Sequence, residues 1–256
     1  MKRTNLANSI PDDYFSNWLE YSEKNKENHL KYLGPIEKIT PAEAKKIHKS
    51  IQEFQLGEAS EGLQLIKHAQ SWSKKINNPD YLKIIKLFIG EENRHSGYLA
   101  AFLKSQDLSL GKKSFTDKAF RTTRNLFGLE VSIRVLAAAE IIATIYYPCL
   151  MVATSNEYLK SICTRITKEE IEHVKFQMQN LAALNLNKNE IWFRFSNLLH
   201  LFFILGTSII ILPVHLPVIQ SKYGKNPISF LNAVIGEAQK AMALIKKSRD
   251  LLVSRS

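Results

Sequence analysis

Four stretches of this chain with the apolar periodicity of a helix carry glutamate inside the apolar stripe. Such a stripe advances by three or four residues and is normally the face that packs into the core. The four stripes read Ile51-Phe54-Glu58-Glu61-Leu65, Ile85-Phe88-Glu92-His95-Leu99-Phe102, Ile133-Ala137-Glu140-Thr144-Tyr147-Met151 and Leu159-Cys163-Ile166-Glu170-His173-Gln177. In the second and the fourth, a histidine follows the glutamate by three residues and so lies on the same face. A fold that buries these stripes together must bring several carboxylates and two imidazoles into its core.

The rest of the sequence is also helical in pattern, and we find no convincing strand alternation. A capping residue followed by a proline marks a helix start at Thr40-Pro41, and Asn77-Asn78-Pro79 is a helix breaker. The expected helices cover about 11–32, 41–77, 80–106, 117–154, 155–185, 188–212 and 226–253. We therefore predict an all-α fold.

Carboxylates in a core need a counter-charge, because burying them alone is costly and several of them would repel one another. A pair of divalent cations removes both costs. A glutamate and a histidine three residues apart can bind one ion. A single glutamate from each of two other helices can then bridge or cap the pair of ions. This is the ligand set of ferritin-like di-iron and di-manganese bundles. The predicted metal ligands are Glu58, Glu92, His95, Glu140, Glu170 and His173.

The spacing of these ligands fits two helical hairpins. Glu92 follows Glu58 by 34 residues and Glu170 follows Glu140 by 30 residues, so each hairpin returns to a similar height. One ligand is undecided at this point, because Glu61 shares a helix face with Glu58. Counted from the turn that follows its helix, Glu61 lies at a height along the bundle that matches the height of Glu140 better than Glu58 does.

The ligand set also predicts how the chain is organised. We expect one ferritin-like di-iron domain over 1–256, built on a four-helix core bundle at about 41–185. Extra helices flank this bundle, including the C-terminal helices at about 188–253. The cofactor is expected to be two iron ions, with a manganese–iron pair as the alternative, since both use these ligands.

Two pentapeptides resemble a known family. EENRH at 91–95, followed by an apolar helix, is similar to the signature of the soluble acyl-acyl carrier protein desaturases, and EEIEH at 169–173 resembles their second motif. The segment LPVHL at 212–216 is similar to one that follows the desaturase bundle, and the resemblance covers about 45–220. Gly57-Glu58 resembles the start of a ligand helix in rubrerythrins, and a similar glutamate occurs in desaturases, which favours Glu58 over Glu61.

The resemblance implies an enzyme, a di-iron oxidase that activates O2 and oxidises an unactivated C–H bond of a fatty acyl chain. The substrate would be carried by an acidic acyl carrier protein, electrons would come from a ferredoxin-like donor, and the enzyme would be a homodimer. Desaturases have a threonine three residues after the fourth-helix glutamate, whereas here Ala143 takes that position and Thr144 follows. A threonine four residues on resembles the bacterial multicomponent hydroxylases, so Thr144 is the expected catalytic residue and hydroxylation competes with desaturation. In the second motif, Glu172 replaces the family's arginine.

Other functions remain open beside this one. They are a di-iron oxygenase acting on an aldehyde or an arylamine, a tRNA hydroxylase, and an iron-oxidising or peroxide-reducing ferritin-like protein. The net charge of +11 suits an acidic carrier protein, an anionic membrane surface or nucleic acid. We expect no nucleic-acid partner, because no basic stretch is interleaved with aromatic residues.

The expected location is cytoplasmic, with peripheral membrane association as the alternative. The two cysteines, Cys149 and Cys163, show no redox or zinc spacing, and the first residues lack the apolar core of a signal peptide. The most apolar run, 198–219, is long enough to cross a bilayer. Because it contains two histidines and two prolines, we favour a buried or partly membrane-facing helix over a membrane span.

Glutamates 91 and 169 directly precede two predicted ligands and could orient the metal-bound imidazoles, with Arg94 pairing one of them. The alternative for these residues is a solvated helix edge. For Tyr146 and Tyr147, ordinary packing is favoured over a role beside the metals.

Overall fold

The computed structural model describes residues 10–59, 62–112 and 128–255. Within these ranges all regular secondary structure is helical and there is no strand, which confirms the predicted all-α class. The helices are a short 3-10 helix η2 (Asp12–Phe15), α1 (Ser16–Lys26), α2 (Pro41–Glu58), α3 (Leu63–Lys75), α4 (Pro79–Ser105), α6 (Leu129–Ala153), α7 (Glu157–Leu184), α8 (Glu190–Tyr223) and α9 (Pro227–Arg255).

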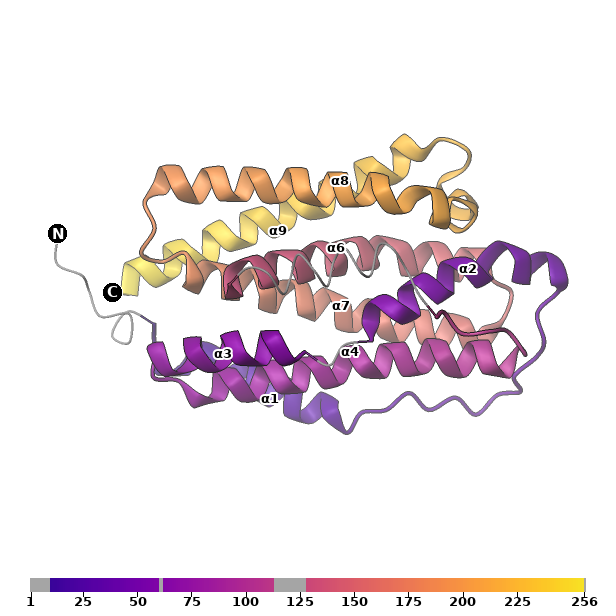
Figure 1. Cartoon of the computed structure of the whole chain (residues 1–256), viewed down its shortest axis with the longest axis horizontal. Helices are drawn as coiled ribbons and strands as arrows, with labels where there is room; N and C mark the ends of the chain where they lie inside the picture. The colour runs from indigo at the N-terminus through magenta and orange to yellow at the C-terminus, as the bar shows by residue number, and fades with distance from the viewer. Residues whose placement is uncertain (1–9, 60–61, 113–127, 256) are drawn as a thin grey trace.

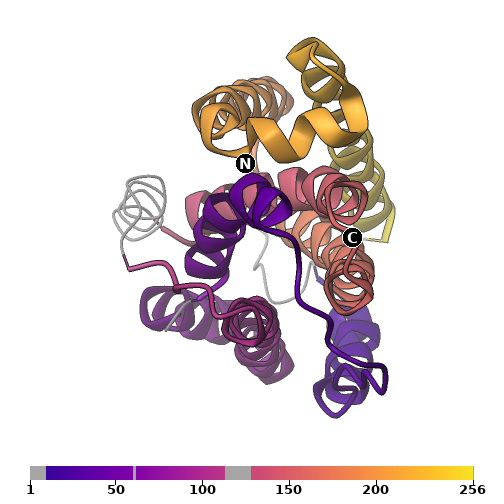
Figure 2. The same ribbon diagram turned by 90° about the vertical axis from the view of Figure 1, so that its right-hand side faces the viewer.

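The helices lie roughly along one long axis (Figure 1). Helix α2 packs on α4 and α6 packs on α7, and the two pairs meet through contacts of α4 with α7 and of α2 with α6. Helices α1 and α3 lie against α4, while α8 and α9 form a hairpin that covers α6 and α7. Seen from the end, this hairpin lies on one side of the bundle and α3 and α4 lie on the other (Figure 2).

The helix starts follow the capping residues in the sequence. Thr40, Asn78 and Asn156 each accept a hydrogen bond from a backbone N–H in the first turn of the helix that follows. Pro41 and Pro79 occupy the first helical position, where a missing N–H costs nothing. The Thr40 cap confirms the predicted start of α2, and the start of α4 at Pro79 confirms the predicted break at 77–79.

The single helix expected over 41–77 is wrong, because the chain breaks between α2 and α3. Helix α2 ends at Glu58, and α3 starts after Gly62, which has φ +63°. A side chain at Gly62 would be strained by this left-handed backbone and would also overlap Ile89. The break places Glu58 at the last turn of its helix.

Two other helix ends differ from the prediction. The first helix was expected to reach residue 32, but α1 ends at Lys26 because tertiary hydrogen bonds draw the next segment along α4: the backbone N–H groups of Leu30 and Ile39 donate to Tyr98 and Gln106. Helix α8 was expected to end near 212 but runs to Tyr223. The predicted helix start at 117 lies outside the described residues, which resume at 128.

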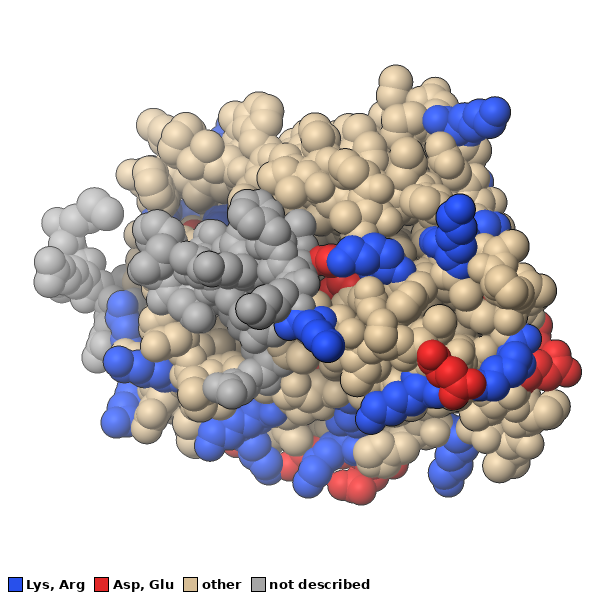
Figure 3. Space-filling model, turned by 45° about the vertical axis from the view of Figure 1, so that its right-hand side comes forward, with Lys and Arg blue, Asp and Glu red and all other residues tan. Residues whose placement is uncertain are grey.

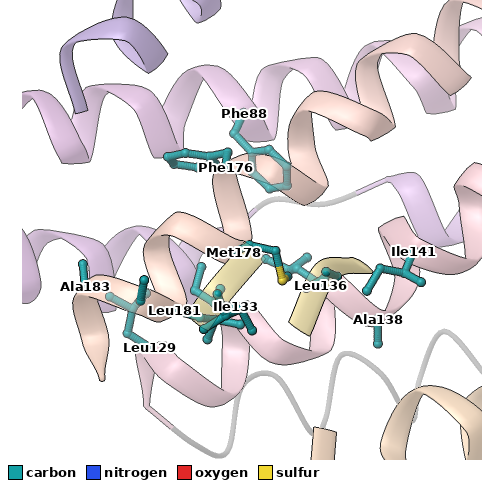
Figure 4. Packing of buried hydrophobic residues seen from close by; sticks show 14 of the residues in the cluster. Phe88, Leu129, Ile133, Leu136, Ala138, Ile141, Phe176, Met178, Leu181 and Ala183 are labelled. Carbon is teal, nitrogen blue, oxygen red and sulfur yellow. The ribbon is translucent and has the colours of Figure 1, made fainter. Parts of the chain in front are cut away.

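Two apolar clusters divide the core along the bundle axis. One contains Ile85 and Phe88 of α4 together with Phe176 and Leu181 of α7, and Figure 4 shows part of it, with the rings of Phe88 and Phe176 close together. The other cluster packs the opposite halves of these helices, with Leu99 and Phe102 on α4 and Leu159, Cys163 and Ile166 on α7. Glu58, Glu92, His95, Glu140, Glu170 and His173 lie between the two clusters.

Candidate metal centre

Side chains from three helices meet in this polar layer. Glu58 of α2, Glu92 and His95 of α4, and Glu170 of α7 each offer a ligand atom within 4.8 Å of the others. Nδ1 of His95 is 3.1 Å from Oε1 of Glu170, and Nδ1 of His173 is 3.0 Å from Oε1 of Glu92. The two imidazole rings are tilted by 32° with centroids 5.7 Å apart. Helices α4 and α7 therefore each contribute a glutamate and a histidine that face the pair on the other helix.

The fourth helix adds Glu140, which is buried. Its Oε1 accepts a hydrogen bond of 3.1 Å from Nε2 of Gln177 on α7, and its carboxyl group interacts electrostatically with His173, Glu170 and Glu92. On the opposite side of the layer, Oε1 of Glu58 accepts a hydrogen bond of 2.6 Å from the hydroxyl of Tyr147.

The atoms that point into the layer lack ordinary hydrogen bonds. Among the described residues, no donor or acceptor satisfies Oε1 of Glu92, Oε2 of Glu140, either oxygen of Glu170, or Nδ1 of His95 or His173. Native proteins leave few buried polar atoms unsatisfied, and each such atom needs an explanation. Here the unsatisfied atoms are oxygen and imidazole nitrogen atoms that face a common space, which fits a divalent cation bound among them.

The opposite edges of the imidazoles contact carboxylates. Nε2 of His95 is 2.8 Å from Oε2 of Glu169, and Nε2 of His173 is 3.7 Å from Oε2 of Glu91. The hydrogen bond to Glu169 fixes the ring of His95 with Nδ1 towards the layer. Because 3.7 Å is too long for a hydrogen bond, Glu91 places a charge beside His173 without fixing its ring. Both glutamates are buried, so the interpretation as solvated helix edges is wrong.

Asn25 of α1 joins these two outer carboxylates. Its amide donates to Oε1 of Glu91 and, over 2.7 Å, to Oε1 of Glu169. Arg165 binds Glu169 through Nε at 2.6 Å and also donates to Oδ1 of Asn25, and Arg94 lies 3.8 Å from Glu91. Neither Asn25 nor Arg165 was predicted from the sequence as part of the site. Arg165 precedes Glu169 by four residues, the spacing of a helical ion pair, whereas no local pattern marks Asn25.

Charges in the layer shift the pKa values in opposite directions. Burial raises the pKa of Glu58 and of Glu140, and for Glu58 the neighbouring carboxylates Glu92 and Glu170 raise it further. Burial lowers the pKa of His95 and His173, but the surrounding glutamates outweigh it and raise both well above the ordinary value. Burial likewise raises the pKa of Glu170, but the two imidazoles outweigh it and lower it. Without a metal, the layer thus favours protons on Glu58, Glu140 and both histidines, which means that it favours added positive charge.

The remaining predicted residues lie outside this set of contacts. The hydroxyl of Thr144, one turn after Glu140 on α6, donates to the carbonyl of Ile141 in its own helix over 2.7 Å. Glu61, the alternative ligand, lies outside the described residues. Tyr147 contacts the layer through its hydrogen bond to Glu58, whereas the hydroxyl of Tyr146 contacts Ser50 instead.

Tyr146 belongs to a second buried polar cluster, next to the layer. The hydroxyl of Ser50 on α2 is 2.7 Å from the hydroxyl of Tyr146 on α6 and 2.7 Å from Nδ1 of His215 on α8. The ring of Phe54 stacks on Tyr146 with a centroid distance of 3.8 Å. This cluster ties three helices together and explains why α8 continues beyond Pro213.

Comparison of the chain with protein-family models, with curated proteins and with solved structures finds no match. The fold and the site define the class by themselves: an all-helical protein whose core holds a buried cluster of glutamate and histidine residues compatible with a di-iron site.

Proposed function

We propose that the protein is a di-iron oxidase that activates O2 to oxidise a C–H bond of a fatty acyl chain. The observation that carries the proposal is the set of buried, unsatisfied ligand atoms that four helices direct into one layer. Six side chains would hold two iron ions: Glu58, Glu92, His95, Glu140, Glu170 and His173. Bound iron in its reduced state would supply the electrons with which O2 is activated.

The protein's own groups would prepare the site for this chemistry. Glu169 holds the imidazole of His95 by its outer edge, and Glu91 places a negative charge 3.7 Å from the outer nitrogen of His173. The hydroxyl of Tyr147 fixes one oxygen of Glu58 and leaves the other turned inward. The apolar clusters on both sides exclude water, which favours oxidation of a substrate over loss of oxidising equivalents to solvent.

The choice of an acyl substrate rests on the resemblance of EENRH and EEIEH to the acyl-acyl carrier protein desaturases. The net charge of +11 suits an acidic carrier protein and an acidic ferredoxin-like donor. Thr144, four residues after Glu140, favours hydroxylation as the competing outcome to desaturation.

Single-turnover mass spectrometry tests the proposal. The protein is loaded with Fe(II) without oxygen, mixed with acyl chains that are free or attached to carrier protein, and then exposed to O2. Loss of two hydrogen atoms from a chain supports desaturation, and gain of one oxygen atom supports hydroxylation. Iron oxidation with every chain unchanged overturns the acyl proposal and leaves an iron-handling role. If the protein binds no iron at all, the proposed metal centre is wrong.

A further inference from the structure

The outer face of α8 is apolar and exposed over most of its length. Eight large apolar side chains of this helix are exposed, among them Ile191 at 83%, Phe202 at 61% and Ile210 at 62%. The others are Trp192, Phe195, Leu198, Leu199 and Ile209. No charged residue occurs between 195 and 221, a stretch of about 40 Å in a helix. A soluble surface rarely carries an apolar strip of this size without a partner.

Figure 3 shows this contrast on the surface. The upper part, where α8 lies in Figure 1, is almost entirely uncharged, with basic residues near its right-hand end, whereas basic and acidic residues gather along the lower part. On this face of the molecule, the uncharged surface therefore lies on the side of α8.

The inner face of α8 is held to the bundle by buried hydrogen bonds. His215 binds Ser50 of α2, Nε2 of His200 lies 2.8 Å from the carbonyl oxygen of Arg134 on α6, and the Arg134 guanidinium donates to Ser196 over 3.1 Å. Because these hydrogen bonds hold its inner face to the bundle, α8 presents only its outer face to a partner. By length and composition, α6, α8 and α9 are each long and apolar enough to cross a membrane, but α8, held in this way, lies along a surface.

The charges around the strip favour an anionic partner. From residue 190 to the end, the chain has eight basic residues and three acidic ones, so the most apolar hairpin is also basic. Lys222 and Lys225 lie exposed at one end of the strip, and Arg194, paired with Glu190 over 2.7 Å, lies near the other. A second copy packed in parallel along the strip would bring these lysines against each other, whereas anionic lipid headgroups would complement them.

From these observations we infer that the outer face of α8 binds the surface of an anionic phospholipid bilayer. The helix lies in the plane of the membrane, with Phe195, Leu199 and Phe202 inserted among the acyl chains and the flanking lysines among the headgroups. This inference does not depend on the metal centre.

Vesicle flotation tests the inference with the purified full chain. Vesicles of phosphatidylcholine alone are compared with vesicles that also contain phosphatidylglycerol. We expect the protein to float with the anionic vesicles. Phe202→Glu should weaken this binding at least about tenfold, because a phenylalanine that enters the bilayer is replaced by a charge. Leu33→Glu makes the same change in charge at a side chain that is 99% exposed and outside the strip, so it should bind like the wild type.

Further measurements separate the other occupants. Replacing Lys222 and Lys225 with glutamine should weaken binding to the anionic vesicles and leave binding to phosphatidylcholine unchanged. Sedimentation velocity without lipid should give the same mass for the wild type and Phe202→Glu. The inference is overturned if the wild type fails to float, or if it is a dimer that Phe202→Glu dissociates. Resistance of the bound protein to an alkaline wash would also overturn it, because that behaviour belongs to a membrane-spanning protein.

Discussion

Nε2 of His95 on α4 lies 2.8 Å from Oε2 of Glu169 on α7, while Nδ1 of the same ring lies 3.1 Å from Oε1 of Glu170. Two adjacent glutamates of one helix therefore contact opposite edges of one imidazole. The outer contact keeps a proton on Nε2, because a carboxylate accepts, so a bound metal would displace the second proton from Nδ1 and take the lone pair that faces the layer.

Substitution of Glu169 should weaken metal binding without removing a ligand. Glu169→Gln keeps the size of the side chain but loses its charge on Nε2 of His95, so we expect iron affinity to fall by about ten- to a hundred-fold. Anaerobic titration with Fe(II) measures this. Glu172→Gln, in the same helix turn, is the control because Glu172 pairs with Lys175 on the surface. Equal iron affinity for both variants would show that the contact does not orient the ring.

Removal of a buried carboxyl group should stabilise the metal-free protein. Burial raises the pKa of Glu140 in the folded state, so near neutral pH folding forces an ionised group of the unfolded chain to take up a proton. Glu140→Gln avoids this cost, and we expect a higher Tm at pH 7, by about 2–4 °C for each kcal/mol recovered. The gain should vanish as the pH falls below the unfolded pKa, where the group is protonated in both states.

The same variant should respond less to iron, because Glu140 is a proposed ligand. Thermal melts with and without Fe(II) measure this second effect. A lower Tm for metal-free Glu140→Gln at neutral pH would contradict the view that the uncompensated carboxyl destabilises the core.

Ser50→Ala should destabilise the fold through the cluster that anchors α8. The change removes the shared hydrogen-bond partner of Tyr146 and His215, both buried, and leaves two polar groups unsatisfied. We expect a loss of about 1–3 kcal/mol in the free energy of unfolding, measured by urea denaturation. Ser71→Ala is the control, since Ser71 is an exposed residue of α3, and its stability should match the wild type.

His200 should make the protein sensitive to mild acid. Burial and the nearby Arg134 charge lower the pKa of His200 to about 3, so the folded state keeps this ring neutral while the unfolded chain binds a proton below its ordinary pKa of 6.5. His200 therefore does not reduce the free energy of unfolding at pH values above the pKa of the unfolded chain. As the pH falls from about 6.5 towards 3, it reduces stability by up to about 1.4 kcal/mol per pH unit.

His200→Gln keeps a donor for the carbonyl of Arg134 but cannot titrate. Urea denaturation across this pH range should therefore give the variant a shallower fall in stability than the wild type. Parallel pH profiles for the two proteins would show that His200 is solvated.

The sequence predicted the buried cluster of glutamates and histidines better than the ends of the helices that carry it. Glu92 and His95, and Glu170 and His173, lie three residues apart within long uninterrupted helices, so their common face follows from helix geometry alone. Glu58 is different, because its position depends on the break before Gly62, and the periodic pattern continued through that break. The end of α8 was likewise misplaced, because Pro213 and Pro217 are helix breakers in isolation, whereas the hydrogen bond from Ser50 to His215 and the burial of Val218 and Ile219 hold the last turns in place.

The sequence by itself determined the helical class, the caps that start α2 and α4, and the four stripes whose glutamates had to share a core, because these depend on spacing along one helix. Tertiary structure decided which atoms face inward. Asn25, from a helix outside the stripes, joins Glu91 to Glu169, and Ser50 joins α6 to α8. Such contacts connect residues far apart in the chain, and no local period records them, since their energy exists only once the helices have packed.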